Sequence, residues 1–190
     1  MYRTVGPMPD TVIARETAIA GVVLHPLAVN PDERGSFTEF FCDSWGLPIA
    51  PRQWSVVTSR ARALRGMHLH LNHDELLTVL KGRATVGLHD LRKASPTSGR
   101  SATIALDGAS PACLVFPRGV LHGWYFHQDS IHVQAVSEEY AIYHPHDNLG
   151  CHWADPALNI PWPDRAPIIS ARAAGLPRLA DLKKAVQHKL

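Results

Sequence analysis

The histidines of this sequence are numerous and unevenly spaced. Twelve occur in 190 residues, and five of them fall in two short stretches, 68–73 and 122–127. Imidazole titrates near neutrality and binds transition metals, so this concentration indicates a metal site or a proton-transfer site. The alternative is that histidine is simply tolerated on half-exposed strands, and composition alone does not separate the two.

The spacing of these histidines favours a metal-type arrangement. His68 and His70 are two residues apart in LRGMHLHL, so on a strand their side chains project from one face. Glu75 opens the next apolar run, and His122 follows a Pro/Gly turn in PRGVLH. The order H-x-H-x4-E-x6-G, then P-x-G-x-x-H, is the two-part signature of the cupin barrels. We expect His68, His70, Glu75 and His122 to bind one divalent transition metal (Zn, Fe, Mn, Co or Ni), although cupins also use these positions without metal.

Short apolar runs separated by turn residues must position this cluster. They are rich in β-branched and aromatic residues and recur at a spacing of roughly 8–12 residues, which predicts a β-sandwich or barrel. We therefore expect an all-β fold, a jelly-roll barrel of the cupin type, as one domain over 1–190 with its core at about 20–165. The segment 176–190 has apolar residues at helical spacing instead and predicts a short C-terminal helix.

The bulk properties exclude several classes of protein. A formal net charge of +2 does not favour binding to nucleic acid or to a membrane surface. No apolar run approaches the ~20 residues of a membrane helix, and the first 21 residues lack the apolar centre of a secretory signal. Three distant cysteines, Cys42, Cys113 and Cys151, do not suggest a disulfide framework. We expect a cytoplasmic protein.

Five longer segments resemble motifs of the dTDP-4-dehydrorhamnose 3,5-epimerase family. They are PDERGSFTEFF (31–41), QWSVVTSRARALRGMH (53–68), GRATVGLHDLRKASPTSG (82–99), FPRGVLHGWY (116–125) and CHWADPALNIPWP (151–163). The resemblance runs from about residue 31 to 163. It implies an enzyme that epimerises the carbons flanking the C4 ketone of a nucleotide-linked deoxy sugar. It also implies a homodimer and no organic cofactor.

The resemblance assigns roles to individual residues. The ketone acidifies the neighbouring C–H bonds, so a base can remove a proton and inversion follows when a proton returns on the other face. By resemblance the base falls on His68, and the Asp that orients it falls on Asp155. The implied contacts to the sugar nucleotide are Arg34, Phe37, Glu39, Gln53, Arg65 and His122. Arg65 and His68 have opposite strand parity, so both reach one pocket only if the strand is irregular, and Gly66 between them permits a bulge.

The catalytic positions depart from the family pattern. The family's Lys is Glu75 here, and the Tyr that serves as the opposing acid falls at about Gln134. Tyr140 and Tyr143 are close enough in sequence to replace that acid, and each also fits a plain strand or loop aromatic. We take Tyr140 as the candidate acid.

The family's Gln two residues after the base is His70 here, and with Glu75 it completes the metal-ligand set. A bound cation would replace the missing Lys in polarising a ketone. If His68 ligates that metal, however, its lone pair is not available to a proton, so the two roles of His68 compete and both stay open.

The sequence thus predicts an epimerase or isomerase of a nucleotide-linked 4-keto-6-deoxy sugar, with C3-only action and metal assistance both open. One alternative is a metal-dependent cupin of the dioxygenase or decarboxylase type acting on a small metabolite. Another is a non-catalytic relative that binds sugar nucleotides. The sugar-nucleotide motifs argue against the first alternative, and retention of His68 and Asp155 argues against the second.

Overall fold

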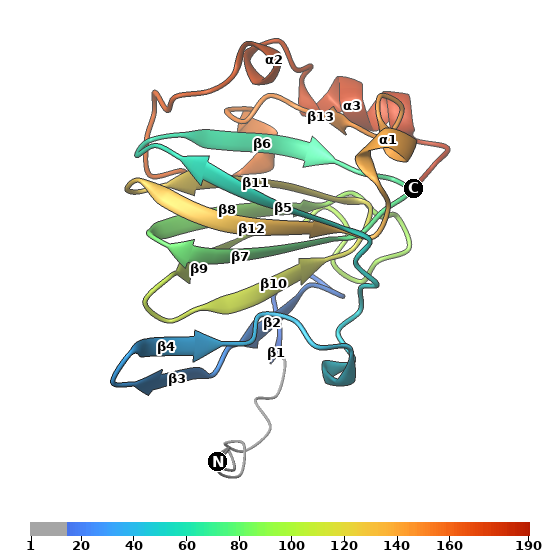
Figure 1. Ribbon diagram of the computed structural model, residues 1–190. Coiled ribbons are helices and arrows are strands. Elements are labelled where there is room, and N and C mark those ends of the chain that lie inside the picture. Colours follow the sequence, from blue (N-terminus) through green and yellow to red (C-terminus); the bar gives the residue numbers. More distant parts are fainter. Residues whose placement is uncertain (1–14) are drawn as a thin grey trace.

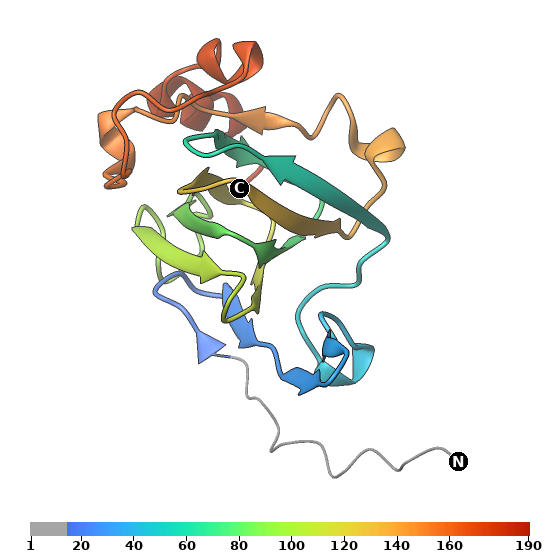
Figure 2. The same ribbon diagram turned by 60° about the vertical axis from the view of Figure 1, so that its left-hand side comes forward.

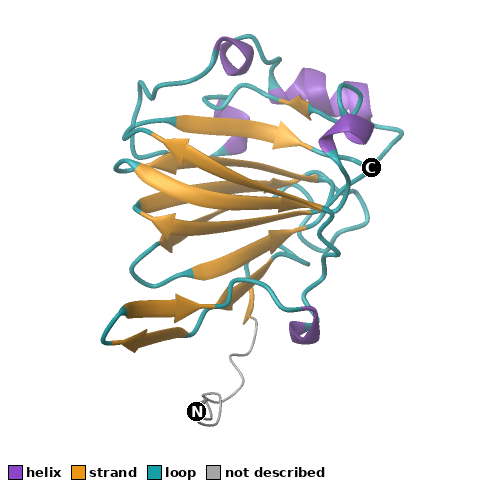
Figure 3. Cartoon of the chain, viewed as in Figure 1, coloured by secondary structure: helices purple, strands orange, loops and turns teal. Residues whose placement is uncertain are grey.

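Two antiparallel sheets face one another in the computed structural model, which describes residues 15–190 (Figure 1, Figure 3). The first 14 residues, most of the segment judged above for a secretory signal, lie outside the described residues. The six-stranded sheet has the spatial order β1 (Arg15–Glu16), β2 (Val23–Pro26), β10 (Ala112–Phe116), β7 (Glu75–Lys81), β12 (Ser130–Val136) and β5 (Gln53–Ser59). The five-stranded sheet has the order β13 (Leu149–Gly150), β6 (Leu64–Leu69), β11 (Val120–Phe126), β8 (Arg83–Asp90) and β9 (Ser101–Asp107).

A separate hairpin and five short helices complete the described chain. The hairpin consists of β3 (Val29–Asp32) and β4 (Gly35–Thr38), which pair only with each other. It lies at the lower edge of the barrel in two views, away from β6 and β11 (Figure 1, Figure 2). The helices are η1 (Asp43–Trp45), α1 (Tyr140–Tyr143), η2 (Pro156–Leu158), α2 (Ala171–Ala174) and α3 (Leu179–Val186).

Strand alternation builds the barrel core. Leu77 on β7 and Trp124 on β11 belong to the apolar cluster between the two sheets. Leu76, next to Leu77, and Leu121, three residues before Trp124, belong to clusters on the outer faces. Successive side chains of a strand point to opposite faces, so each strand contributes to the interior and to an outer layer. The predicted all-β barrel is confirmed.

The C-terminal helix covers the outside of the five-stranded sheet. Leu179, Leu182 and Val186 of α3 are buried in one cluster with Met67 and Leu69 of β6. The predicted helix therefore exists, and it is shorter than the predicted segment because residues 176–178 and 187–190 are not helical. Within residues 15–190, none of the helices combines the length and apolar character needed to cross a membrane.

An irregularity in β6 has a direct effect on the barrel interior. His68 pairs with His122, but Arg65 pairs with Trp124, so three steps along β6 match two steps along β11. The extra residue reverses the parity, and Arg65 and His68 therefore face the same side of the sheet. The strand is thus irregular where Gly66 permits a bulge, and the backbone there has φ of +130°, a conformation that favours glycine.

Candidate active site

A polar cluster interrupts the apolar interior between the two sheets. Since Met67 and Leu69 face outward, the alternate residues His68 and His70 face inward, and His122 lies opposite His68 on β11. Glu75 faces them from the start of β7, on the same face as the core residue Leu77. The structure therefore brings together the four residues that the sequence named as metal ligands.

Glu75 is the centre of this cluster. Its Oε1 lies 3.2 Å from His70 Nε2, and its Oε2 lies 3.1 Å from His122 Nε2. Gln134 of β12 donates from Nε2 to Glu75 Oε1 at 3.2 Å. Burial raises the pKa of the Glu75 carboxyl, but the neighbouring His122 and His70 outweigh it and hold that pKa well below its ordinary value. The interior thus contains a buried carboxylate.

His73 and Asp147 belong to the same cluster, and the sequence did not assign a role to either. His73 Nε2 lies 3.6 Å from Glu75 Oε1, and His73 Nδ1 lies 2.9 Å from Asp147 Oδ2. Burial lowers the pKa of His73, but Asp147 and Glu75 outweigh it and raise that pKa to about 9. His73 could have been found from the dense run HLHLNHDE, whereas the cupin spacing passes over it.

Asp147 is a buried carboxylate in the loop between α1 and β13. It accepts hydrogen bonds from the backbone N–H groups of Leu71 and Asn72, in addition to its contact with His73. Its backbone oxygen also lies 2.5 Å from His70 Nδ1. No local sequence pattern marks this residue, because it reaches the cluster from more than 70 positions away along the chain.

His68 lies beside these groups without bonding to them. Its ring centroid is 6.0 Å from that of His122 and 6.2 Å from that of Trp124. Among residues 15–190, no hydrogen bond involves its ring nitrogens. Burial, and secondarily the charge at His122, lower the pKa of His68 to about 3. The imidazole is therefore neutral near pH 7, and a nitrogen lone pair is available to accept a proton.

Tyr140 and Tyr143 occupy different environments on α1. Tyr140 is 46% exposed, and its backbone N–H donates to Gln53 Oε1. Tyr143 is half-buried, stacks on His73 with centroids 4.1 Å apart and meets His70 edge-on at 5.8 Å. Tyr143 thus borders the cluster, whereas the ring of Tyr140 stacks on His144. The choice of Tyr140 as the acid stays a prediction.

Asp155 has a structural role that the sequence did not predict. Its Oδ1 accepts from the N–H of Ala157, and its Oδ2 accepts from the N–H of Leu179. It thereby caps η2 and the start of α3, on the outside of the five-stranded sheet. Both carboxylate oxygens thus accept backbone N–H groups, and among residues 15–190 no hydrogen bond joins Asp155 to His68. An orienting role for Asp155 stays a prediction.

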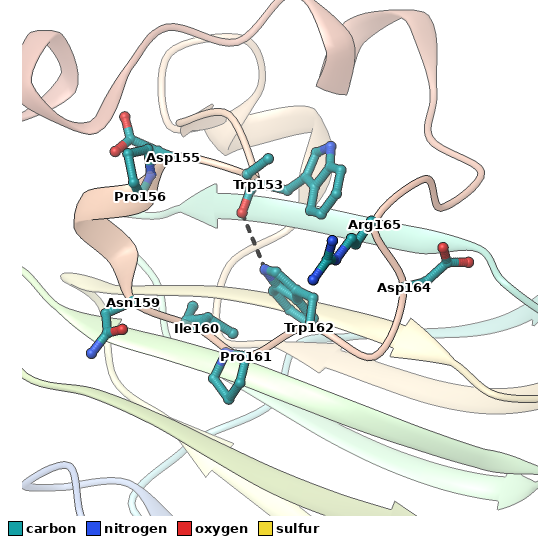
Figure 4. A pocket seen from close by; sticks show the side chains of 10 residues that line it. Trp153, Asp155, Pro156, Asn159, Ile160, Pro161, Trp162, Asp164 and Arg165 are labelled. Carbon is teal, nitrogen blue, oxygen red and sulfur yellow. Dashed lines mark hydrogen bonds between the residues drawn. The ribbon is translucent and has the colours of Figure 1, made fainter.

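The surface hollow beside Asp155 also lies outside the barrel. Trp153, Trp162 and Arg165 line it, and Trp162 Nε1 donates to the backbone oxygen of Trp153 (Figure 4). Trp162 covers the outer face of β8 at Gly87, where a Cβ would lie 2.6 Å from the indole. This hollow is therefore separated from His68 by the sheet itself.

The predicted substrate contacts are dispersed. Arg34 is 84% exposed and pairs with Asp32, and Phe37 is 65% exposed on the same β3–β4 hairpin. Glu39 follows that hairpin and is half-buried. Gln53 is the first residue of β5. Arg65 lies on β6, and its Nε donates to Oγ of Ser59, the last residue of β5. The binding roles of these residues stay predictions.

The cluster supports two kinds of chemistry. A neutral His68 can act as a base toward an acidic C–H bond. The buried carboxylate and imidazoles of His70, His73 and Glu75 form a group of donors that fits a cation.

Comparison with known proteins gives a consistent result. The model of the family described as dTDP-4-dehydrorhamnose 3,5-epimerase matches residues 16–181. A dTDP-4-dehydrorhamnose 3,5-epimerase of Methanothermobacter thermautotrophicus is 30% identical over 78% of this chain and 82% of its own length. One of Neisseria gonorrhoeae is 32% identical over 83% of this chain, and the chain spans only 49% of that relative. The crystal structure of the Bacillus anthracis enzyme with TDP and pyrophosphate bound is 30% identical, with a TM-score of 0.80 over 87% of this chain and 98% of that one.

Proposed function

The chain belongs to the dTDP-4-dehydrorhamnose 3,5-epimerase family, and we propose that it is an isomerase acting on a dTDP-linked 4-keto-6-deoxy sugar. The reaction would begin with removal of a proton from a carbon next to the C4 ketone. A proton returned on the opposite face would invert that carbon.

The position of His68 is the observation that carries this proposal. It lies on the inner face of β6, is neutral near pH 7 and donates to no other described residue. It is therefore the imidazole of the cluster that is available to a substrate C–H bond. Arg65, brought to the same face by the bulge, supplies a cation for a diphosphate.

The residues around His68 support a restricted version of the family reaction. Glu75 stands where the family has a Lys that stabilises the enolate, and Gln134 stands at the position of the acid Tyr. Each missing acid–base group costs ~10²–10⁴-fold in rate. We propose that proton removal at C3 is retained, that inversion is slower than removal, and that C5 reacts little.

A metal ion would compensate for the missing Lys. We propose that a divalent transition metal near Glu75 polarises the C4 ketone, which is chemistry that such a cation supplies when bound. Support comes from three buried atoms that could bind a metal and that have no hydrogen-bond partner among the described residues. They are His73 Nε2, Glu75 Oε2 and His122 Nε2.

We further propose a cytoplasmic homodimer. Arg34 and Phe37 are exposed on a hairpin away from the protein's own His68, which fits a hairpin that completes the site of a second copy. All three cysteines are free thiols, as expected in a reducing compartment.

Solvent exchange tests the proposal directly. The protein is incubated with dTDP-4-keto-6-deoxyglucose in D2O, and NMR follows deuterium at C3 and C5 together with the configuration of each carbon. We expect deuterium uptake at C3 that exceeds net inversion, and little uptake at C5. His68→Asn should suppress the uptake by ~10²-fold or more. Full uptake in His68→Asn would reject His68 as the base, and no uptake by the wild-type protein would reject the reaction.

One observation favours a second function. The convergence of His70, His73 and Glu75 also suits a metal-dependent cupin enzyme acting on a small oxygenated metabolite. The two functions differ in their need for a nucleotide. Millimolar dTDP should raise the melting temperature of a sugar-nucleotide enzyme, because it binds the folded state alone. Absence of a shift with dTDP and UDP would favour the second function.

A further inference from the structure

Three imidazoles of the interior cluster have their tautomers fixed by acceptors. His70 Nδ1 lies 2.5 Å from the backbone oxygen of Asp147, and His122 Nδ1 lies 2.9 Å from that of Val120. A carbonyl oxygen only accepts, so both rings carry a proton on Nδ1. His73 Nδ1 likewise faces the carboxylate of Asp147 at 2.9 Å. In the neutral rings the lone pair is therefore on Nε2.

These lone pairs converge on a carboxylate. His70 and His73 place Nε2 at 3.2 Å and 3.6 Å from the same oxygen of Glu75, Oε1. The side chains of His73 and Glu75 are 0% and 2% exposed, so water does not replace the missing donors. Two imidazole Nε2 atoms that face one carboxylate oxygen in a buried site carry a large desolvation cost unless a cation lies between them. That cation is a proton on His73 in the metal-free protein, in keeping with its raised pKa, and a bound metal ion displaces this proton.

We propose that His70 Nε2, His73 Nε2 and Glu75 Oε1 bind one divalent transition metal ion, and that His68 lies outside the ligand set. The three donor atoms lie within 4.8 Å of one another. Metal–ligand bonds of about 2.1 Å place two tetrahedral donors about 3.4 Å apart. The two measured separations from Glu75, 3.2 Å and 3.6 Å, bracket this value. Two imidazoles and one carboxylate form a set used for Zn and Fe and leave positions open for a substrate oxygen.

Asp147 is the residue that positions the ligands. Its carboxylate accepts the Nδ1 proton of His73, and its backbone oxygen accepts that of His70. The backbone N–H groups of Leu71 and Asn72 hold the same carboxylate in place. A carboxylate behind a ligating histidine fixes the ring and increases its basicity as a ligand. One residue thus orients both imidazoles.

This ligand set differs from the sequence prediction in two ways, because His73 takes the place of His68 and His122 is left out. His68 has no acceptor that fixes its tautomer among residues 15–190, and its ring centroid is 6.5 Å from that of His70. The competition between the two roles of His68 then disappears, since the metal and the base use different imidazoles. Metal binding itself does not depend on the proposed function. Only the role of the metal, which is to polarise the C4 ketone, rests on it.

The test measures metal binding to the full-length protein without substrate. The protein is stripped with a chelator and titrated with Zn²⁺ and with Co²⁺, whose visible absorption reports coordination. Elemental analysis follows desalting. We expect one ion per chain. His73→Asn should weaken binding by more than ~100-fold and Asp147→Asn by ~10–100-fold, whereas the matched variant His68→Asn should stay within about threefold of the wild-type protein.

The outcomes separate the two ligand sets. Weakened binding in His68→Asn, or full binding in His73→Asn, would overturn the proposal, as would no binding by folded wild-type protein at 1 mM metal. Should His73→Asn fail to fold, ring ¹⁵N shifts of the wild-type protein decide the matter. Zn²⁺ should change the ¹⁵N chemical shifts of Nε2 in His70 and His73 and leave those of the His68 ring nitrogens unchanged. A change in the His68 shifts would again overturn the proposal. These results do not depend on solvent exchange, so metal binding and the epimerase proposal can fail separately.

Discussion

A Cβ atom added to Gly66 would lie 2.5 Å from the Cα of Gly123 on the neighbouring strand. Real Cβ atoms do not approach backbone this closely, so β6 and β11 meet here without room for a side chain. The contact lies at the bulge that turns Arg65 to the same face as His68. Two residues without side chains therefore determine which charged group faces the same side of the sheet as the proposed base.

Gly66→Ala should destabilise the protein strongly. The substitution combines the clash with a backbone φ of +130°, and we expect a loss of at least about 3 kcal/mol in the free energy of unfolding. Gly99→Ala is the matched control, since it has φ of +78° and no atom within 4 Å of the added Cβ. It should cost about 1–2 kcal/mol. Equal losses in denaturant titrations of the two variants would show that the strands can separate at Gly66.

Asp155→Ala should affect stability rather than proton transfer. The variant removes acceptors for the N–H groups of Ala157 and Leu179, and loss of such caps costs about 1–2 kcal/mol. Asp181→Ala, an exposed acidic position in the first turn of α3, should change stability by less than about 0.5 kcal/mol. Solvent exchange at C3 by Asp155→Ala should stay within a few-fold of wild type. A loss of exchange in a variant of unchanged stability would restore Asp155 as the residue that orients His68.

His132 makes the folded protein sensitive to mild acid. Burial, then the charge of Arg65, lower its pKa from 6.5 to about 4. The unfolded chain therefore binds more protons than the folded chain between pH 6.5 and 4, and stability falls as the pH falls through this range. His132→Phe, beside the stacked ring of Phe126, should flatten this part of the stability curve and leave the protein at least as stable near pH 5. Urea titrations at pH 7.5 and pH 5 check this, and parallel curves for variant and wild type would contradict it.

The sequence predicted the convergence of His68, His70, Glu75 and His122 because strand alternation and the spacing of one motif determine which side chains face the interior. The bulge at Gly66 followed from the same alternation. His73 and Asp147 escaped prediction because both come from loops, whose paths have no periodicity. The capping role of Asp155 escaped prediction for a related reason. Its partner Leu179 is 24 residues further along the chain, and only the docking of α3 brings the two together.

The last prediction concerns the acid that completes inversion. Gln134 cannot donate a proton as the family's Tyr would, and the tyrosine that borders the cluster is Tyr143, which is stacked on His73. Tyr143→Phe keeps this stacking and removes only the hydroxyl. We therefore expect it to lower net inversion at C3 by ~10²-fold while deuterium uptake at C3 continues, because uptake needs only the base.

Tyr140→Phe is the matched control on the same helix. Its ring is 46% exposed, and the hydrogen bond to Gln53 comes from its backbone, so inversion and uptake should both stay within about threefold of wild type. The ratio of inversion to uptake, measured by NMR in D2O, isolates the second proton transfer from the first. A ratio that falls in Tyr140→Phe and not in Tyr143→Phe would assign the acid to Tyr140, and an unchanged ratio in both would place the returning proton on solvent.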